Sequence, residues 1–526
     1  MQKTNRLWIT VLALGWVFDF LFWKHTPGVS FAIFVVLTLG TGFWLTRGLG
    51  VSAARGTLLL LLPIGLLAAM TFVRAEPMTA FLTHVMTLFL MFVLVVTFSG
   101  GRWLSYGLAD YVVRLFSLLG SMIARPLGFT AEARRDTPEE ETPKARRQVW
   151  PVLRGLLMAL PVVALLASLL ASADLVFAQR LDDFIKLFRL ENLPEYIFRG
   201  VYILILAYLL AGIYLHAAER SRDEKLQGEE KPVVPPFLGF TEAAIVLGSV
   251  ILLFAMFVII QFQYFFGGQA NISVEGFTYS EYARRGFGEL LGVAFISLLL
   301  LMGFSALSKR ETPLQRRAFS GLGIGVVALV LVMLVSAYQR LALYEDAYGF
   351  SRLRTYSHVF LLWLAALLVA VVALEWIQKQ RLFAVSMLIT ALGFALSLAF
   401  LNVDGFIVRQ NVARAEAGHE LDVAYLASLS EDAVPALAQA FASTRLSAGT
   451  REAVGAALAC RAARTGSRQP DTSWQSFHVS RWQADQTMAS LKSSLSGYKE
   501  DDDEWPLILT TPGGVEYDCW KADTFD

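Results

Sequence analysis

Long apolar runs, separated by short polar connections, recur along the first four-fifths of this chain. Each run approaches the roughly twenty residues that a helix needs to cross a hydrocarbon layer about 30 Å thick. Backbone amides inside lipid must be hydrogen-bonded within the segment, so we expect these runs to be helices. The pattern predicts about eleven membrane spans, at 7–23, 28–46, 56–73, 79–99, 151–172, 197–217, 242–264, 286–306, 319–338, 358–377 and 382–401.

Two further stretches mix apolar and charged positions at helical spacing. In 103–123, Asp110 and Arg114 lie in the middle of the run, so we expect an amphipathic helix in the plane of the membrane interface. The alternative is a twelfth span, which would invert the sidedness of everything after it. The stretch 174–196 has the same amphipathic character.

The apolar pattern ends after residue 415. Apolar residues at helical spacing predict a short soluble helical segment over 416–466, with Ser430 and Thr450 as expected helix caps. Residues 467–526 are predicted to be a polar tail, partly disordered. The predicted fold class is therefore all-α: a polytopic transmembrane helix bundle (1–415), followed by the soluble segment and the tail.

Composition and charge placement agree with a membrane location. Hydrophobic residues make up 56% of the chain and charged residues 17%, whereas soluble domains carry about 25% charge. With the N-terminus inside, Lys and Arg are about twice as frequent in the inner connections as in the outer ones, as the positive-inside rule expects. We therefore expect a cytoplasmic N-terminus and a tail outside. The basic residues form no stripe suited to phosphate backbones, so nucleic acid is not an expected partner.

The chain has two cysteines, Cys460 and Cys519, and both follow the last span. They can form a disulfide if the tail lies in an oxidising compartment, and otherwise they are free thiols.

Polar side chains gather at the ends of three late spans, all expected on the outer side. Thr278 and Glu281 have the spacing of a capping box, and Gly349 and Ser351 are suited to end one helix and begin the next. The members of the three clusters are Tyr279, Glu281, Tyr282, Arg284, Arg285 and Glu289; Arg340, Tyr344, Glu345, Arg352, Arg354, Tyr356 and His358; and Asn402, Asp404 and Arg409.

Such clusters have three interpretations. They can join helix ends through ion pairs, bind a lipid headgroup or a small molecule through arginine, or carry out catalysis. Tyrosine and arginine also anchor helices at membrane interfaces, which favours the structural interpretation. Four of the ionisable residues inside predicted spans are singled out, because a charge costs about 2.5–3.5 kcal/mol at the bilayer centre. They are Asp19, His84, Glu289 and Glu375, and each serves either a buried hydrogen bond between helices or a proton or ion path.

Motifs of the common catalytic classes are absent from the sequence. It contains no H-E-x-x-H, no G-x-S-x-G, no P-loop and no Cys/His spacing suited to zinc. We therefore assign no catalytic residue, no metal site and no cofactor.

Several blocks, taken in order, resemble an uncharacterised family of bacterial multi-pass membrane proteins, a domain of unknown function of the 4153/4173 type. The blocks are FDFLFWKHTPGVSF (18–31), YSEYARRGFGELL (279–291), LYEDAYGFSRLRTYSH, LNVDGFIVRQNVAR and LDVAYLASLSEDAVPAL. The resemblance covers roughly residues 15–440. It implies a bacterial cytoplasmic-membrane protein and supplies no reaction, ligand or catalytic residue.

Together these observations predict an integral membrane protein that is not an enzyme, either a transporter or a scaffold or sensor of the cell envelope. The alternative is a membrane enzyme that acts on a lipid-linked substrate through the outer clusters. The bilayer is the expected partner, and a protein partner stays unspecified. Convergence of the clusters on one cavity would favour binding or catalysis, and dispersal would favour a structural role. A polar path lined by Asp19, His84 or Glu289 would favour transport.

Overall fold

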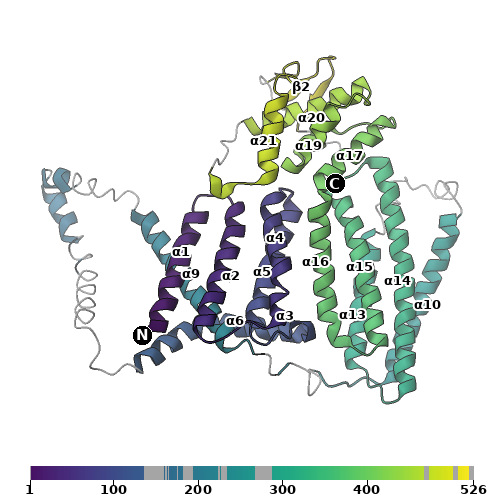
Figure 1. Cartoon of the computed structure of the whole chain (residues 1–526). Helices are drawn as coiled ribbons and strands as arrows, with labels where there is room; N and C mark the ends of the chain where they lie inside the picture. Colours follow the sequence, from purple (N-terminus) through teal and green to yellow (C-terminus); the bar gives the residue numbers. More distant parts are fainter. Residues whose placement is uncertain are drawn as a thin grey trace. The chain divides into compact units, whose positions relative to one another are not determined.

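A computed structural model describes residues 2–135, 159, 163, 165–174, 176–181, 193–222, 225–226, 234–266, 287–466, 473–501 and 507–520. Helices dominate these residues, and eleven of them are long and apolar enough to cross a membrane. The predicted all-α, polytopic helix bundle is therefore confirmed (Figure 1).

The long helices follow the predicted spans closely. Ten of the eleven candidates coincide with them, and the eleventh is Leu108–Ala131, in the stretch for which we expected an interfacial helix. The predicted span 151–172 lies largely outside the described residues. The helices are α1 (Gln2–Phe22), α2 (Val29–Gly48), α3 (Arg55–Leu58) with α4 (Leu61–Val73), α5 (Pro77–Val96), α6 (Leu108–Arg135), α9 (Leu193–Glu219), α10 (Phe240–Phe266), α13 (Phe287–Leu307), α14 (Pro313–Tyr348), α15 (Arg352–Trp376) and α16 (Phe383–Leu401).

Protein contacts cover only part of these apolar surfaces. In each candidate span between 17% and 44% of the most apolar window is buried inside the protein. The remaining apolar side chains would be exposed to water in a soluble protein, at about 25 cal/mol per Å² of apolar surface. A surrounding hydrocarbon layer removes that cost, which is why the multi-pass membrane assignment follows from the packing as well as from the sequence.

The chain divides into two compact units, and unit 1 comprises residues 1–24, 36–52 and 116–221. In it α1 and α9 run antiparallel: the Trp23 indole donates to Glu195 at the start of α9, whereas Leu7 and Val11 share a core with Leu215. The second half of α6 packs against α9 at Gly212. A Cβ there would lie 2.4 Å from the Met122 Cα, so this close approach requires glycine.

Unit 2 comprises residues 25–35, 53–115 and 222–526. Its helices α4, α5, α10 and α13–α16 stand side by side, and one end of them carries a smaller domain (Figure 1). We call residues 403–520 the terminal domain, and the opposite end of the unit 2 helices the far end. The connections α13–α14 and α15–α16 lie at the far end, where Arg310 pairs with Glu375.

The terminal domain is folded around its own apolar core. Its helices are α17 (Val403–Glu416), α18 (Val423–Ser428), α19 (Val434–Phe441), α20 (Ala448–Gly466) and α21 (Val479–Leu491). The strands β1 (Lys499–Asp501), β2 (Ile508–Thr510) and β3 (Glu516–Asp518) form an antiparallel sheet in the order β1-β2-β3. Within 467–526, expected as a polar tail, the described residues 473–501 and 507–520 contribute a helix and a sheet. Ser430 caps the turn after α18 as predicted, but Ser447 rather than Thr450 caps α20.

Cys460 and Cys519 form a disulfide that joins α20 to the segment after β3. The bond closes a loop with a sequence separation of 59 residues. On the chain-entropy account such a loop stabilises the folded domain by about 4 kcal/mol. Of the two alternatives left by the sequence, the structure shows the pair.

The terminal domain also contacts the connection before α2. The Val29 amide donates to the Phe477 carbonyl at 2.9 Å. A Cβ on Gly28 would lie 2.6 Å from that carbonyl oxygen and 2.7 Å from the Ser476 carbonyl carbon. Both atoms belong to the backbone, so only glycine fits without a shift of the chain.

We therefore predict that Gly28→Ala destabilises the protein by about 1–3 kcal/mol, the usual cost of overpacking. Thermal unfolding of the detergent-solubilised chain should begin several degrees lower than in the wild type. Gly40→Ala is the matched control, because a Cβ on that exposed residue of α2 meets nothing within 4 Å. Equal midpoints for the two variants would contradict the prediction.

Candidate functional site

Three buried carboxylates lie where the terminal domain meets the helices of unit 2. They belong to Glu76, Asp404 and Asp432, whose exposed fractions are 1%, 0% and 4%. We call them and their hydrogen-bond partners the junction network. A buried carboxylate costs several kcal/mol unless donors replace its water, so the partners decide what each group can do.

Asp404 lies in the first turn of α17, where the helix dipole favours a negative charge. It is placed there by Asn402, whose backbone is left-handed (φ 51°) and whose side chain accepts from the Gly405 amide. The Arg352 guanidinium donates to both carboxylate oxygens, at 2.8 and 2.5 Å. The Ser430 amide adds a bond of 2.6 Å. One carboxylate thus holds together α15, α17 and the start of η6 (Glu431–Ala433).

Glu76 is the N-cap of α5, directly before Pro77 at the first helical position. Its carboxylate accepts from the amides of Met78 and Thr79, at 2.9 and 2.7 Å, and from the Thr79 hydroxyl at 2.6 Å. The Tyr356 hydroxyl donates to it from α15. This carboxylate therefore joins the start of α5 to α15.

Asp432 lies in η6 and reaches the connection between α4 and α5. It accepts from the backbone amides of Ala75 and Glu76, at 2.7 and 2.9 Å. The Ser480 hydroxyl of α21 also donates to it, and the Arg74 guanidinium lies 3.6 Å away. Asp432 is thus the terminal domain's main polar contact with the α4–α5 connection.

Each of the three carboxylates takes its donors from at least two elements. A general acid or base must exchange a proton with a substrate within hydrogen-bond reach, and these lone pairs are occupied by protein donors. Removal of one partner from such a pair costs about 3–5 kcal/mol, because a buried charge is left uncompensated. The arrangement is that of an anchor between the terminal domain and the helices.

The second predicted cluster joins α14 to α15. Gly349 ends α14 with a positive φ of 82°, as predicted, whereas Ser351 occupies the N-cap position of α15 without a side-chain capping bond. The Arg354 guanidinium donates to the Gly349 carbonyl at 2.5 Å and lies 4.2 Å from the centre of the Tyr344 ring. Across the same turn, Glu345 lies 3.2 Å from His358 Nδ1.

Among the remaining predicted residues, those that the structure describes do not meet at one cavity. Tyr279, Glu281, Tyr282, Arg284 and Arg285 lie outside the described residues. Glu289 in the first turn of α13 and Arg409 in α17 are exposed, and Arg340 is half-buried in α14.

Each of the predicted intramembrane residues Asp19, His84 and Glu375 has its own contacts. In unit 1, Asp19 accepts from Nε and Nη2 of the Arg199 guanidinium, at 2.9 and 2.5 Å, and from the Tyr202 hydroxyl. His84 Nδ1 lies 2.7 Å from the Ala80 carbonyl, and its ring packs on Phe31. Glu375 lies at the far end of α15, beside a cavity.

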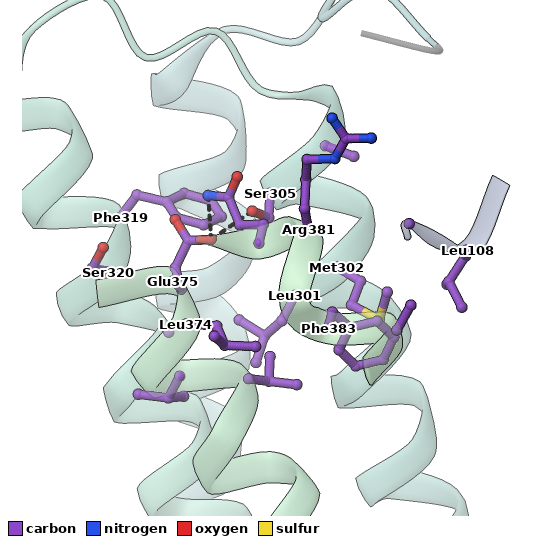
Figure 2. A pocket seen from close by; sticks show the side chains of 17 residues that line it. Leu108, Leu301, Met302, Ser305, Phe319, Ser320, Leu374, Glu375, Arg381 and Phe383 are labelled. Carbon is purple, nitrogen blue, oxygen red and sulfur yellow. Dashed lines mark hydrogen bonds between the residues drawn. The ribbon is translucent and has the colours of Figure 1, made fainter. Parts of the chain in front are cut away.

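That cavity has a volume of about 280 Å³ and lies between α13, α14, α15, α16 and the start of α6 (Figure 2). Most of its wall is apolar, with Leu301, Met302, Phe319, Leu374 and Phe383 among the lining residues. The polar wall consists of Ser305, Ser320, Glu375, Gln380 and Arg381. We call this space the far-end cavity.

The negative charge of Glu375 is balanced by a neighbouring arginine. Glu375 pairs with Arg310 and accepts from the Ser305 hydroxyl at 2.5 Å and from the Gln380 amide at 2.9 Å. The Arg310 guanidinium also lies 4.5 Å from the centre of the Phe319 ring. Arg381 extends away from the apolar side chains (Figure 2). Its guanidinium lies 3.5 Å from the Asp110 carboxylate.

Sequence reasoning missed several of these residues. It did not assign Glu76, Asp432, Arg310 or Arg381 to a site, although it named Tyr356, the partner of Glu76, and Glu375, the partner of Arg310. The Glu-Pro-x-Thr order at 76–79 before an apolar run is a helix-start signal that could have identified Glu76. Asp432 carries no comparable signal, because its partners are 48 or more residues away. Within the described ranges no group of three or more His, Cys, Asp or Glu side chains could hold a metal.

Fold and site together define a multi-pass helical membrane protein whose folded terminal domain is anchored to its helices. The sequence model of the family described as Domain of unknown function (DUF4153) matches residues 61–440, and the chain belongs to this family. The match confirms the resemblance and covers α4 to α19, including all three junction carboxylates. Comparisons with curated proteins and with solved structures find no match.

His478 makes the stability of the junction dependent on pH. Its Nε2 lies 3.1 Å from the Arg74 carbonyl and is assigned as the N–H donor, and its buried Nδ1 has no hydrogen-bond partner among the described residues. Burial lowers the pKa of His478 below its usual value of 6.5, although nearby Asp432 opposes this. The neutral ring is thus favoured in the folded state. Its stabilising contribution is present above pH 6.5 and is lost as the pH falls below that value.

We predict that the thermal midpoint of the wild type falls between pH 7.5 and pH 5.5, in part through this histidine. His478→Gln keeps an N–H donor but cannot titrate, so its midpoint should vary less with pH. His419→Gln, at an exposed position of the same domain, should keep the wild-type slope. Identical slopes for His478→Gln and the wild type would refute this role.

Proposed function

We propose that this protein is a non-enzymatic scaffold or sensor of the cell envelope, in which the terminal domain and the membrane helices of unit 2 move as one body. The junction network is the single observation that carries the proposal. Asp404 and Asp432 take donors from both sides of the junction, so the domain cannot tilt without breaking charged hydrogen bonds. Displacement of either part would be transmitted to the other, which is what a scaffold or a sensor requires.

The distribution of charged residues supports a scaffold or sensor over a transporter. Asp19, His84 and Glu375 are each hydrogen-bonded to different neighbouring groups. A transport path needs ionisable groups that line one water-filled route and exchange partners. An enzyme acting on a lipid-linked substrate would need the outer clusters around a shared cavity, and their described members tie helix ends together.

We further propose that the terminal domain lies outside the cytoplasm and the N-terminus inside. The terminal domain contains a disulfide, and disulfides form and persist in oxidising compartments. The far end carries the exposed basic residues Lys309, Arg316, Arg317 and Lys379, as expected of a cytoplasmic face.

Helix α6 fits the cytoplasmic surface in this arrangement. Within unit 2, Leu108 at its start lines the far-end cavity. Within unit 1, Ser121 and Arg125 bond to His216 and Glu219, in the last turns of α9. Contacts with helix ends at two places suit a helix that lies in the membrane plane. Its exposed apolar residues recur at helical spacing on one face, at Val112, Phe116, Leu119, Ile123 and Leu127.

This sidedness predicts opposite labelling of two single cysteines in the background Cys460→Ser/Cys519→Ser. In intact cells a membrane-impermeant maleimide should label Thr444→Cys, which is exposed in the terminal domain, and should not label Lys309→Cys. Both should react after the cells are permeabilised. Labelling of Lys309→Cys alone in intact cells would reverse the proposed orientation.

The proposed rigid coupling can be measured directly, because both native cysteines are in the disulfide. Spin labels at Thr444→Cys and at Ala347→Cys, exposed at the end of α14, report the distance between the terminal domain and the helices. For the full chain in nanodiscs we expect one narrow distance distribution. Asp404→Ala should broaden it, since Arg352 and Ser430 lose their shared acceptor, whereas the exposed Arg409→Ala should leave it unchanged.

A broad distribution in the otherwise unmodified chain would contradict the proposed function. Far-ultraviolet circular dichroism and an intact disulfide establish that the Asp404→Ala protein is folded. An unchanged narrow distribution in that folded variant would show that the junction network is not what couples the two parts.

A further inference from the structure

The far-end cavity lies at a depth where lipid, rather than water, is the natural occupant. Gly323 lines it from α14, ten residues after Pro313, which places the cavity's inner wall about 15 Å along that helix. Its polar residues Glu375, Gln380 and Arg381 lie at the helix ends. The cavity therefore runs from the membrane surface into the hydrocarbon layer.

The wall divides into an apolar and a polar part, as the shape of an amphiphile requires. Leu301, Leu374 and Phe383 contribute apolar surface in the interior, where water would find few hydrogen-bond partners. An acyl chain is shielded from water both there and in the bilayer, and in the cavity it gains contact with close-packed side chains.

Charge at the mouth favours an anionic headgroup. The carboxylate of Glu375 is neutralised by Arg310, so it does not repel a phosphate. Arg381 keeps 36% of its side-chain surface exposed at the mouth, beside Asp110. The exposed Lys309, Arg316 and Lys379 lie in the same connections and add positive charge.

We propose that the far-end cavity binds one anionic phospholipid, with part of an acyl chain between α13, α14, α15 and α16 and with the phosphate on Arg381. A guanidinium donates two parallel N–H bonds to a phosphate. The phosphate of a zwitterionic lipid accepts these bonds less well, because its headgroup also carries a bulky cation. Basic pockets between helices on the cytoplasmic side are suited to anionic lipids. The lipid would fix the start of α6, which supplies Gly107 and Leu108 to the wall. The proposal depends on membrane insertion and not on the coupling proposed above.

The test is native mass spectrometry of the full chain, delipidated in detergent and titrated with phosphatidylglycerol or phosphatidylcholine. We expect one phosphatidylglycerol per chain to be retained at lipid concentrations where phosphatidylcholine is not. Arg381→Gln should weaken retention about fivefold, as expected for the loss of one basic group at a membrane surface. Arg381→Lys should recover part of it, and Arg317→Gln, which removes an exposed charge outside the cavity, should have little effect.

The acyl site is tested by filling the cavity. A Cβ on Gly323 meets only Leu301 Cδ2, at 3.6 Å, so Gly323→Leu can extend into the space and should reduce retention at least tenfold. Gly321→Leu is the matched control, because Gly321 is exposed on the same helix and its Cβ would meet nothing within 4 Å.

The Asp110→Asn variant distinguishes two roles of Arg381: binding the lipid phosphate, or only forming an ion pair with Asp110. If Arg381 binds the phosphate, removal of the competing carboxylate should leave phosphatidylglycerol retention equal or increased. If Arg381 acts only by holding Asp110, Asp110→Asn should lower retention as Arg381→Gln does, and the proposal is overturned. It is also overturned by equal retention of the two lipids, or by Gly323→Leu and Gly321→Leu behaving alike.

Discussion

A carboxylate buried at the boundary between lipid and water must find its donors within the protein, and this constraint organises unit 2. Asp404 and Asp432 are in the terminal domain, yet their donors include Arg352 of α15 and the amides between α4 and α5. Glu76 lies in the helical part: its carboxylate accepts from α5 and α15, and its backbone amide donates to Asp432. The hydrogen-bond partners of these carboxylates come from distant parts of the sequence. The carboxylates can therefore all be hydrogen-bonded only when the terminal domain packs on the helices.

The second constraint is the thickness of the hydrocarbon layer. About twenty residues suffice to cross it, but α14 has 36. Since α14 begins at the far end, its excess length carries Tyr344 and Glu345 beyond the apolar layer, toward the terminal domain. The polar contacts between α14 and α15 can therefore form without charge at the bilayer centre. The apolar part of α14 thus crosses the hydrocarbon layer, and its polar contacts form beyond that layer, where a charge is less costly.

The helical architecture could be read from the sequence because it depends on local information. Apolar runs of span length predicted ten of the long helices, and Gly349 marked the end of α14. The terminal domain was less visible: its strands have only three residues each, and the Cys460–Cys519 pairing depends on a fold that brings them together. Residue type alone could not decide whether Ser447 or Thr450 caps α20.

The site was predictable only in part, for the same reason. Charged and aromatic residues near span ends pointed to Arg352, Tyr356 and Asp404, since such residues are costly in lipid and gather at its boundary. Their partners Glu76, Asp432 and Ser480 come from connections far away in the chain, which no periodicity brings together. The far-end cavity escaped notice because its wall consists mainly of ordinary apolar residues, and only the packing of four helices leaves space among them.

Hydrogen exchange at the amides of Ala75, Glu76 and Ser430 measures whether the junction stays closed, because these connecting residues donate to Asp432 and Asp404. If the buried carboxylates hold the terminal domain on the helices, the three amides should exchange as slowly as amides inside α15 and α16. Exchange within seconds at these amides, while the helices stay protected, would show that the junction opens freely and would contradict the account.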